Sequence, residues 1–172
     1  MRAYDHDAAA VARGLGDGQE AAAALRVDPR RVLKTLLAAV DGELVVAVLP
    51  VAARLDLKAL AAAVGGRRAA MADPAAAERA TGCVVGGISP LAQRRRLRTV
   101  VDAAALEHAG VLVSAGRRGL DVELAPQDLV RLTGALVAPV SAAGGSAGTG
   151  PGAGGPTVEP PAAGPSTGPS TG

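Results

Sequence analysis

The stretch that most constrains the fold is a pair of apolar runs around a two-residue turn. Residues 32–40 are VLKTLLAAV and residues 43–50 are ELVVAVLP, with Asp41-Gly42 between them. An Asp-Gly pair between two β-prone apolar runs is the strongest short-range signal for a β-hairpin. We therefore predict an antiparallel hairpin over residues 32–50, and the other elements have to pack around it.

Other regular patterns predict short helices and strands around this hairpin. Apolar spacing that ends at Gly65-Gly66 predicts a helix over residues 55–64, and Asp73-Pro74 is a typical helix start. Further helices are expected over residues 20–25 and 126–132, and further strands over residues 99–102, 110–114 and 120–124. The apolar run CVVGGISP, residues 83–90, predicts one more short strand that ends in a loop of small residues. Hairpin-like successions of strands with helices between some of them indicate an α+β domain.

The composition changes sharply near residue 140. Residues 141–172 contain 10 of the 23 glycines and 6 of the 12 prolines, and Glu159 is their only charge. Such a segment cannot bury enough apolar surface to offset the entropy of ordering its backbone. We therefore expect one domain over residues 1–140 and a disordered tail over residues 141–172. The chain has no Phe or Trp, so Leu, Val and Ala must form the core.

Several classes of protein are excluded by what the sequence lacks. Cys83 is the only cysteine, which rules out an intramolecular disulfide and a CxxC metal site. His6 and His108 have no second ligand at metal spacing, and no nucleotide-binding or nucleophile-elbow motif is present. We therefore expect no metal and no cofactor. With no apolar run long enough to span a membrane and no secretory leader, a cytoplasmic location is the default expectation.

Three features remain as candidates for function, each with a structural alternative. Lys34 stands alone inside an apolar strand, where it serves either a polar cleft or an edge strand that must resist aggregation. Gly86-Gly87 can present unhindered backbone N–H groups to a ligand oxygen, or form a plain tight turn. The run QRRRLR, residues 93–98, is either a phosphate-binding track or a solvated surface.

Taken together, these motifs resemble the YbaK family of free-standing Cys-tRNA(Pro) deacylases, which are related to the editing domain of bacterial prolyl-tRNA synthetases. The resemblance is carried by LKTLLAAVDGELVVAVLP, by the segment that ends GCVVGGISPLAQRRRL, and by VSAGRRGLDVELAPQDL. It extends from about Tyr4 to Thr133. It implies a mixed sheet or partly open barrel flanked by short helices. It also implies tRNA(Pro) as a partner, together with prolyl-tRNA synthetase.

The resemblance also implies roles for individual residues. The implied catalytic residues are Lys34, Gly86, Gly87 and Asp121. The implied substrate-binding residues are Tyr4, Thr35, Ile88, Ser89, Pro90 and Ser114. The implied tRNA contacts are Arg94, Arg95, Arg96 and Arg98. In this family the substrate's own cysteine thiol is thought to attack its ester, so the protein mainly positions the substrate and stabilises charge. Asp121 would then orient the substrate's amino group or Lys34.

This chain departs from the family pattern at a few positions. The family usually has a helix and a strand before the YDHD segment, whereas this chain begins at Met1. We therefore expect either a start site placed too late or a missing first strand. Asp17 and Cys83 stand where aromatic residues are usual, which predicts a wider or less selective pocket. Two alternatives to Cys-tRNA(Pro) hydrolysis follow. One is a deacylase for Ala-tRNA(Pro) or another mischarged tRNA, and the other is a non-catalytic module that binds tRNA or a synthetase.

Overall fold

The computed structural model describes residues 1–7, 9, 16–91 and 93–142. Its centre is the predicted hairpin, formed by β2 (Leu33–Val40) and β3 (Glu43–Pro50), which pair from Leu33 opposite Pro50 to Val40 opposite Glu43. Asp41 and Gly42 both have positive φ angles, 48° and 93°. This is the backbone that a two-residue hairpin turn requires, and Asp-Gly tolerates it better than most residue pairs. The prediction for residues 32–50 is therefore confirmed.

The hairpin belongs to a five-stranded mixed sheet with the order β5-β2-β3-β6-β9. Strands β6 (Arg98–Asp102) and β9 (Leu136–Ala138) run parallel to β3, and β5 (Ala69–Met71) pairs antiparallel with β2. A second sheet contains β1 (Arg2–Ala3), β8 (Leu120–Leu124) and β7 (Val111–Arg117), and a third pairs β4 (Arg54–Leu55) with β10 (Ser141–Ala142). One parallel bridge, between Val32 and Leu112, joins β7 to the start of β2.

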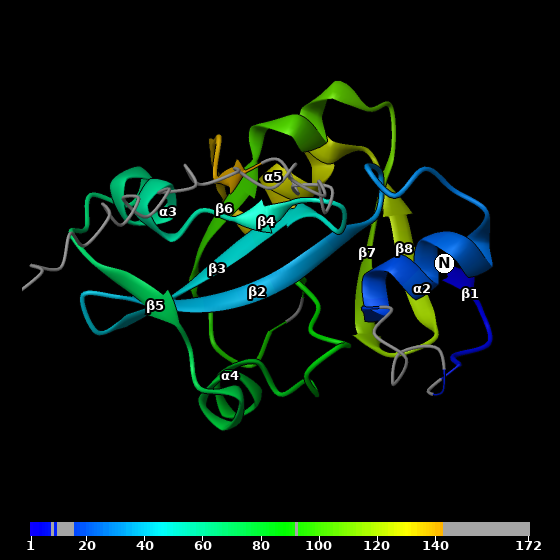
Figure 1. The fold of residues 1–172 in the computed structure, drawn as a ribbon, viewed down its shortest axis with the longest axis horizontal. Coiled ribbons are helices and arrows are strands. Elements are labelled where there is room, and N and C mark those ends of the chain that lie inside the picture. The colour runs from blue at the N-terminus through cyan, green and yellow to red at the C-terminus, as the bar shows by residue number, and fades with distance from the viewer. Residues whose placement is uncertain (8, 10–15, 92, 143–172) are drawn as a thin grey trace, which may run out of the picture.

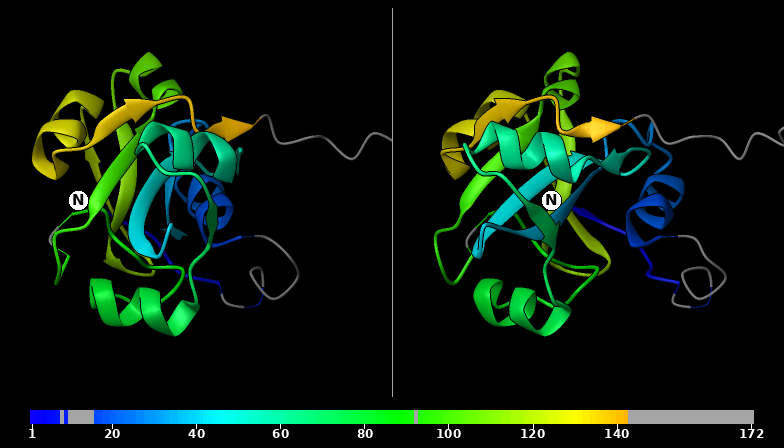
Figure 2. Two further views of the ribbon diagram at one scale, coloured as in Figure 1. Left: turned by 90° about the vertical axis from the view of Figure 1, so that its left-hand side faces the viewer. Right: turned by 60° about the vertical axis from the view of Figure 1, so that its left-hand side comes forward.

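Short helices flank these sheets (Figures 1 and 2). Helix α3 (Leu57–Ala63) and helix α4 (Pro74–Thr81) lie on opposite sides of the β2–β3 hairpin, and α2 (Asp17–Leu25) lies near β7 and β8. A 3-10 turn, η1 (Ala103–Glu107), and α5 (Pro126–Thr133) complete the described part. The sheets form no closed barrel. The α+β class and the flanked mixed sheet are therefore confirmed.

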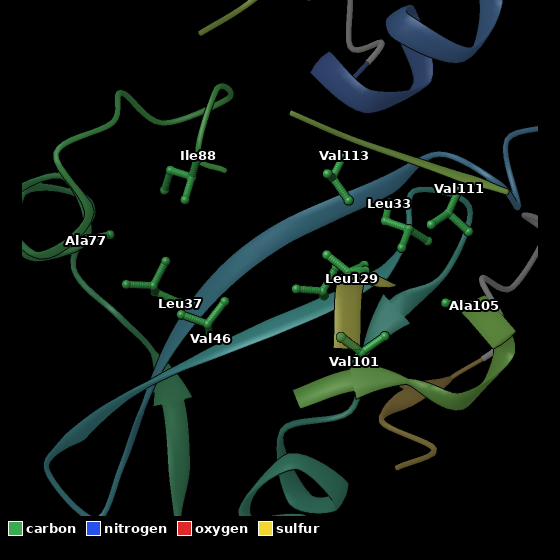
Figure 3. Close-up of a cluster of buried hydrophobic side chains, with 11 residues drawn as sticks. Leu33, Leu37, Val46, Ala77, Ile88, Val101, Ala105, Val111, Val113 and Leu129 are labelled. Atoms are coloured by element: carbon green, nitrogen blue, oxygen red, sulfur yellow. The ribbon is translucent and has the colours of Figure 1, made fainter. Parts of the chain in front are cut away.

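The core lies on both faces of the hairpin. Val46 and Val48 of β3 pack with β7 and α5 on one face, in the cluster drawn in Figure 3. Val45 and Leu49 of the same strand pack with α3 on the other face. A strand that is buried on both faces needs a continuous apolar run, which is what residues 44–49 provide. Small aliphatic side chains fill this core in the absence of Phe and Trp.

The structure corrects one predicted strand and several boundaries. Residues 83–90 form a loop, because Gly86 takes a φ of 86° and the N–H of Gly87 closes a turn onto the carbonyl of Val84. The predicted helix 55–64 begins two residues later, since Asp56 accepts the first backbone N–H groups as its N-cap. The short strands β1, β4, β5, β9 and β10 were not predicted.

The first two residues of the predicted tail form a strand. Ser141 and Ala142 pair with β4, and the backbone N–H of Ser141 donates to the buried carboxylate of Asp102 at 2.7 Å. The ordered part of the chain therefore passes residue 140, and the rest of the predicted tail, residues 143–172, lies outside the described residues. No helix in the described ranges is long and apolar enough to cross a bilayer.

Candidate functional site

A cavity of about 500 Å³ opens between the start of α2, the β2 strand, the glycine loop after α4, and the β7–β8 hairpin. It brings together residues that are far apart in the sequence. The predicted site residues that line it are Tyr4, Lys34, Thr35, Gly86, Ile88, Ser114 and Asp121. The predicted residues Gly87, Ser89, Pro90, Arg94, Arg95, Arg96 and Arg98 are not among the lining residues.

Lys34 is half-buried on β2, which lies between β5 and β3, but β5 pairs only with Ala38, Ala39 and Val40, so the edge-strand alternative stays open at Lys34. Its Nζ donates to the carbonyl of Ala53 at 2.5 Å and to that of Val51 at 3.4 Å. Burial, together with the nearby charge of Arg54, lowers the pKa of Lys34. Since an ammonium group has three donors, one remains for a ligand in the cavity.

Asp121 lies on β8 directly opposite Ser114 of β7, and only 5% of its surface is exposed. Burial raises the pKa of this carboxyl from 3.8 to about 6. Within the described ranges, the carboxylate has no hydrogen-bond or ion-pair partner, and Lys34 donates to carbonyls instead. The prediction that Asp121 orients Lys34 is therefore wrong, and its alternative, the substrate amino group, stays open.

A second polar group in the cavity also lacks a partner. The hydroxyl oxygen of Thr35, next to Lys34 on β2, is buried without a hydrogen bond to any described residue. Buried polar atoms in native proteins almost always have a partner, so an unpaired one calls for an explanation. Asp121 thus gives the cavity an acidic group that is free to bind a ligand, whereas the oxygen of Thr35 is enclosed behind the wall.

The glycine loop is fixed against the β7–β8 hairpin. The hydroxyl of Ser114 donates to the carbonyl of Gly87 at 2.9 Å, and the guanidinium of Arg118 donates to the carbonyl of Val85 at 2.8 Å. A Cβ atom at Gly87 would lie 3.1 Å from the backbone of Arg117, so glycine allows this approach without a shift of the hairpin. Ser114, predicted to bind substrate, therefore also positions the loop.

The two glycines of the loop differ in their free N–H groups. The N–H of Gly87 donates to the carbonyl of Val84 at 3.0 Å, which contradicts its predicted role as a donor to a substrate oxyanion. The N–H of Gly86, on the cavity wall, has no partner among the described residues. The hydroxyl of Ser89 accepts from the N–H of Leu91, and the buried Pro90 follows it, so both shape the loop.

The arginines of the QRRRLR run do not form one track. Arg94 and Arg95 are exposed, whereas the guanidinium of Arg98 donates to the carbonyl of Val64 at 2.7 Å, at the end of α3. The guanidinium of Arg96 lies beside Gly134, the C-cap of α5. Arg98 is exposed as well, so this bond gives it a structural role, and its predicted contact with tRNA stays a prediction. The contacts predicted for Arg94, Arg95 and Arg96 stay predictions.

The sequence did not identify the wall formed by the first turn of α2. Gly16, Gly18 and Gln19 line the cavity there, and a Cβ atom at Gly18 would lie 2.2 Å from a methyl group of Val51. The alternate spacing of Gly14, Gly16 and Gly18 was the available signal, because glycine is needed where another element approaches closely. Met71 and Val85, both largely exposed, add apolar surface at the cavity.

The cavity contains no evident protein nucleophile. Its lining includes neither histidine nor cysteine among the described residues, and the hydroxyl of Ser114 is bound to the loop. The buried hydroxyl of Thr35 has no hydrogen-bonded base that could activate it. Cys83 packs against the core, with its sulfur close to Gly116, and does not line the cavity, so the predicted effect on the width of the cavity stays a prediction. Asp17 begins α2, and its side chain lies outside the described part of the chain. No group of three candidate metal ligands occurs in the described ranges.

Fold and cavity together define a small α+β domain with a partly polar cavity between a helix N-terminus, a lysine strand and a glycine loop. Residues 14–132 match the family described as "Aminoacyl-tRNA editing domain". The chain belongs to this family, and the resemblance to the YbaK group is confirmed.

Individual relatives agree with this assignment. A segment of 64 residues is 34% identical to the "Putative Cys-tRNA(Pro)/Cys-tRNA(Cys) deacylase EbsC" of Enterococcus faecalis, covering 37% of this chain and 39% of that relative. A solved structure described as "a putative trans-editing enzyme for prolyl tRNA synthetase" is 26% identical over 75% of this chain and 82% of the other, with a TM-score of 0.69. Another, "hypothetical protein APE2540", is 33% identical over 72% and 82%, with a TM-score of 0.67.

Proposed function

We propose that this protein is a trans-editing deacylase that releases cysteine from mischarged Cys-tRNA(Pro). Family membership supports aminoacyl-tRNA as the substrate class. The name of the Enterococcus faecalis relative supports cysteine as the amino acid that is released. The aligned segment covers 39% of that relative. The observation that carries the proposal is the cavity, which combines a cation, a buried acid and a free amide and has no activated nucleophile in its described lining.

The absence of a nucleophile from the described lining supports attack by the substrate itself. The cysteine thiol loses its proton, its sulfur attacks the ester carbonyl, and the carbon–oxygen bond to the terminal ribose breaks. The ribose oxygen then takes up a proton, and a four-membered thiolactone leaves, to be hydrolysed by water. Positioning two reacting groups in one molecule can lower the barrier by several kcal/mol, so the protein has mainly to hold the reactive conformer.

Each free group in the cavity has a role in this reaction. The N–H of Gly86 donates to the oxyanion that develops on the carbonyl oxygen, in place of the predicted Gly86 and Gly87 pair. Asp121, buried and unpaired in the described ranges, binds the α-amino group of the aminoacyl ester. The remaining donor of Lys34 binds the terminal adenosine or its phosphate.

Selection of tRNA(Pro) requires more than this cavity. The QRRRLR run is divided between the ends of three helices, so it offers no continuous phosphate track near the cavity. We therefore propose that prolyl-tRNA synthetase acts as a partner and presents the acceptor end. The structure described as a trans-editing enzyme for prolyl-tRNA synthetase supports this association.

The experiment is to incubate the purified protein with Cys-tRNA(Pro) and Ala-tRNA(Pro), each carrying a labelled amino acid, and to follow release in parallel with a gel shift. Release of cysteine faster than alanine is expected. Faster release of alanine would assign the protein to the other substrate, and a gel shift without release would make it a binding module.

Lys34→Ala, with its fold checked by circular dichroism, is expected to lose activity. Full activity in that variant would refute the role of Lys34.

A further inference from the structure

The N-terminal YDHD segment forms part of the cavity wall. Strand β1 pairs with β8, and the N–H of Tyr4 donates to the carbonyl of Gly119 at 3.0 Å. Tyr4 then lines the cavity and packs against an apolar cluster that includes Ala21 and Val51. Because Ala21 and Val51 also line the cavity, the position of Tyr4 affects its shape on that side.

Glu20 of α2 binds this segment with both of its carboxylate oxygens. One oxygen lies 2.8 Å from Nδ1 of His6, and the other accepts the backbone N–H of Asp7. A carboxylate only accepts hydrogen bonds, so the Nδ1 of His6 is the donor. Glu20 is only 4% exposed, and a carboxylate in such a place needs its partners.

These contacts join two walls of the cavity that are separate in the sequence. His6 follows Tyr4 by two positions, and Glu20 directly precedes Ala21. A bond between His6 and Glu20 therefore fixes the segment that carries Tyr4 to the helix that carries Ala21. His6 and Glu20 themselves do not line the cavity.

We propose that the His6–Glu20 pair is a positioning device that holds Tyr4 against α2 and so sets the shape of the substrate cavity. The catalytic consequence rests on the proposed deacylase function. The structural consequence does not, because Tyr4 is the only aromatic residue of the chain and its fluorescence reports on its own surroundings.

Two amide variants of His6 separate the hydrogen bond from the bulk of the ring. The amide nitrogen of asparagine can occupy the position of Nδ1, whereas that of glutamine reaches the position of Nε2. We expect His6→Asn to keep the bond to Glu20, and His6→Gln and His6→Ala to lose it. His108→Ala, at the other histidine of the chain, is the matched control.

The first measurement is acrylamide quenching of tyrosine fluorescence in the full chain. The quenching constant is expected to rise about twofold in His6→Ala and His6→Gln, because a ring released from packing exposes a second face. It should stay at the wild-type value in His6→Asn and His108→Ala. An unchanged constant in His6→Ala and His6→Gln, or a rise in His6→Asn equal to theirs, would overturn the proposal.

The second measurement is the steady-state deacylation of Cys-tRNA(Pro). The KM of His6→Ala and His6→Gln is expected to rise about tenfold, with rescue in His6→Asn, since a small misplacement of a contact surface weakens productive binding. A wild-type KM in those two variants would refute the role in the cavity. If the wild-type protein releases no amino acid at all, the proposed function fails, and the quenching series still decides whether the pair positions Tyr4.

Discussion

Asp121 and Asp102 are both buried, but we expect opposite effects when each is changed to asparagine. Asp121 has no partner for its carboxylate in the described ranges, whereas Asp102 accepts hydrogen bonds from the N–H groups of Ala104, Val140 and Ser141. An unpaired buried charge lowers stability, and a fully bonded one supports it. Asp121→Asn should therefore raise the free energy of unfolding at neutral pH, and Asp102→Asn should lower it.

The size of the first effect follows from the pKa of Asp121. Burial raises this pKa from 3.8 to about 6. Since one pKa unit corresponds to 1.36 kcal/mol, ionising the carboxyl costs the native state at most about 3 kcal/mol. Water that enters the cavity screens part of this cost, so we expect a gain of about 1 to 2 kcal/mol for Asp121→Asn at pH 7.5. In Asp102→Asn an amide nitrogen replaces one carboxylate oxygen, and at the position of Oδ2 it would lose the bonds from the N–H groups of Val140 and Ser141, at a cost of about 2 kcal/mol.

The pH dependence has a defined sign. Between pH 3.8 and about 6, the native state binds a proton at Asp121 more tightly than the unfolded chain does. The wild-type protein therefore loses stability from this group as the pH rises through that range. The asparagine variant has no such group, so its advantage should be small near pH 4 and complete above pH 7.

Urea unfolding followed by far-UV circular dichroism measures these differences, because the chain has no tryptophan to follow. Wild type, Asp121→Asn and Asp102→Asn are compared at pH 4.5 and pH 7.5. The account requires the advantage of Asp121→Asn to grow with pH. If Asp121→Asn were less stable than wild type at pH 7.5, as Asp102→Asn is expected to be, the carboxylate of Asp121 would have a structural partner and the argument for a free acid would be refuted.

Three further predictions come from glycines and one arginine. Gly18→Ala should lose about 1 to 3 kcal/mol of stability and most of its activity, because the new Cβ would lie 2.2 Å from a methyl group of Val51. A Cβ at Gly16 would have no neighbour within 4 Å, so Gly16→Ala should keep its stability and activity. Gly86 and Gly65 have positive φ angles of 86° and 74°, so Gly86→Ala and Gly65→Ala should each lower the stability by about 1 to 2 kcal/mol. Only Gly86→Ala should also lower kcat, and equal kcat values in the two variants would refute the role of the Gly86 N–H. Arg98→Ala should lower the urea midpoint, because it loses the bond to the carbonyl of Val64, and an unchanged midpoint would refute this structural role.

Features with a local physical cause were predictable from the sequence. The hairpin turn depends on two adjacent residues, Asp41 and Gly42, that tolerate positive φ, so the signal and its cause lie together in the chain. Lys34 was conspicuous because a charge inside an apolar strand must have a polar environment. Asp121 lies in a strand of alternating apolar and acidic residues, which predicts an exposed side chain. Its burial could not be predicted, because it depends on the other elements that line the cavity.

Features that depend on distant contacts were not predictable. Strands β4 and β10 have two residues each and exist only because they pair with each other across the chain. The N–H of Gly87 is used in a turn, and the neighbouring loop is held by Ser114 and Arg118, neither of which is near it in sequence. The apolar run that contains this loop therefore gave the wrong secondary structure, since its conformation is set by the β7–β8 hairpin.

The most direct test of the central claim compares cysteine and serine on the same tRNA. Cys-tRNA(Pro) and Ser-tRNA(Pro) differ by one atom, sulfur or oxygen, so the cavity contacts are nearly the same while the nucleophile changes. Single-turnover release of cysteine is expected to be at least about 100-fold faster, because the far weaker nucleophile in serine loses most of the gain from positioning. Equal rates of release for the two amino acids would show that water or a protein group attacks the ester, and would contradict attack by the substrate thiol.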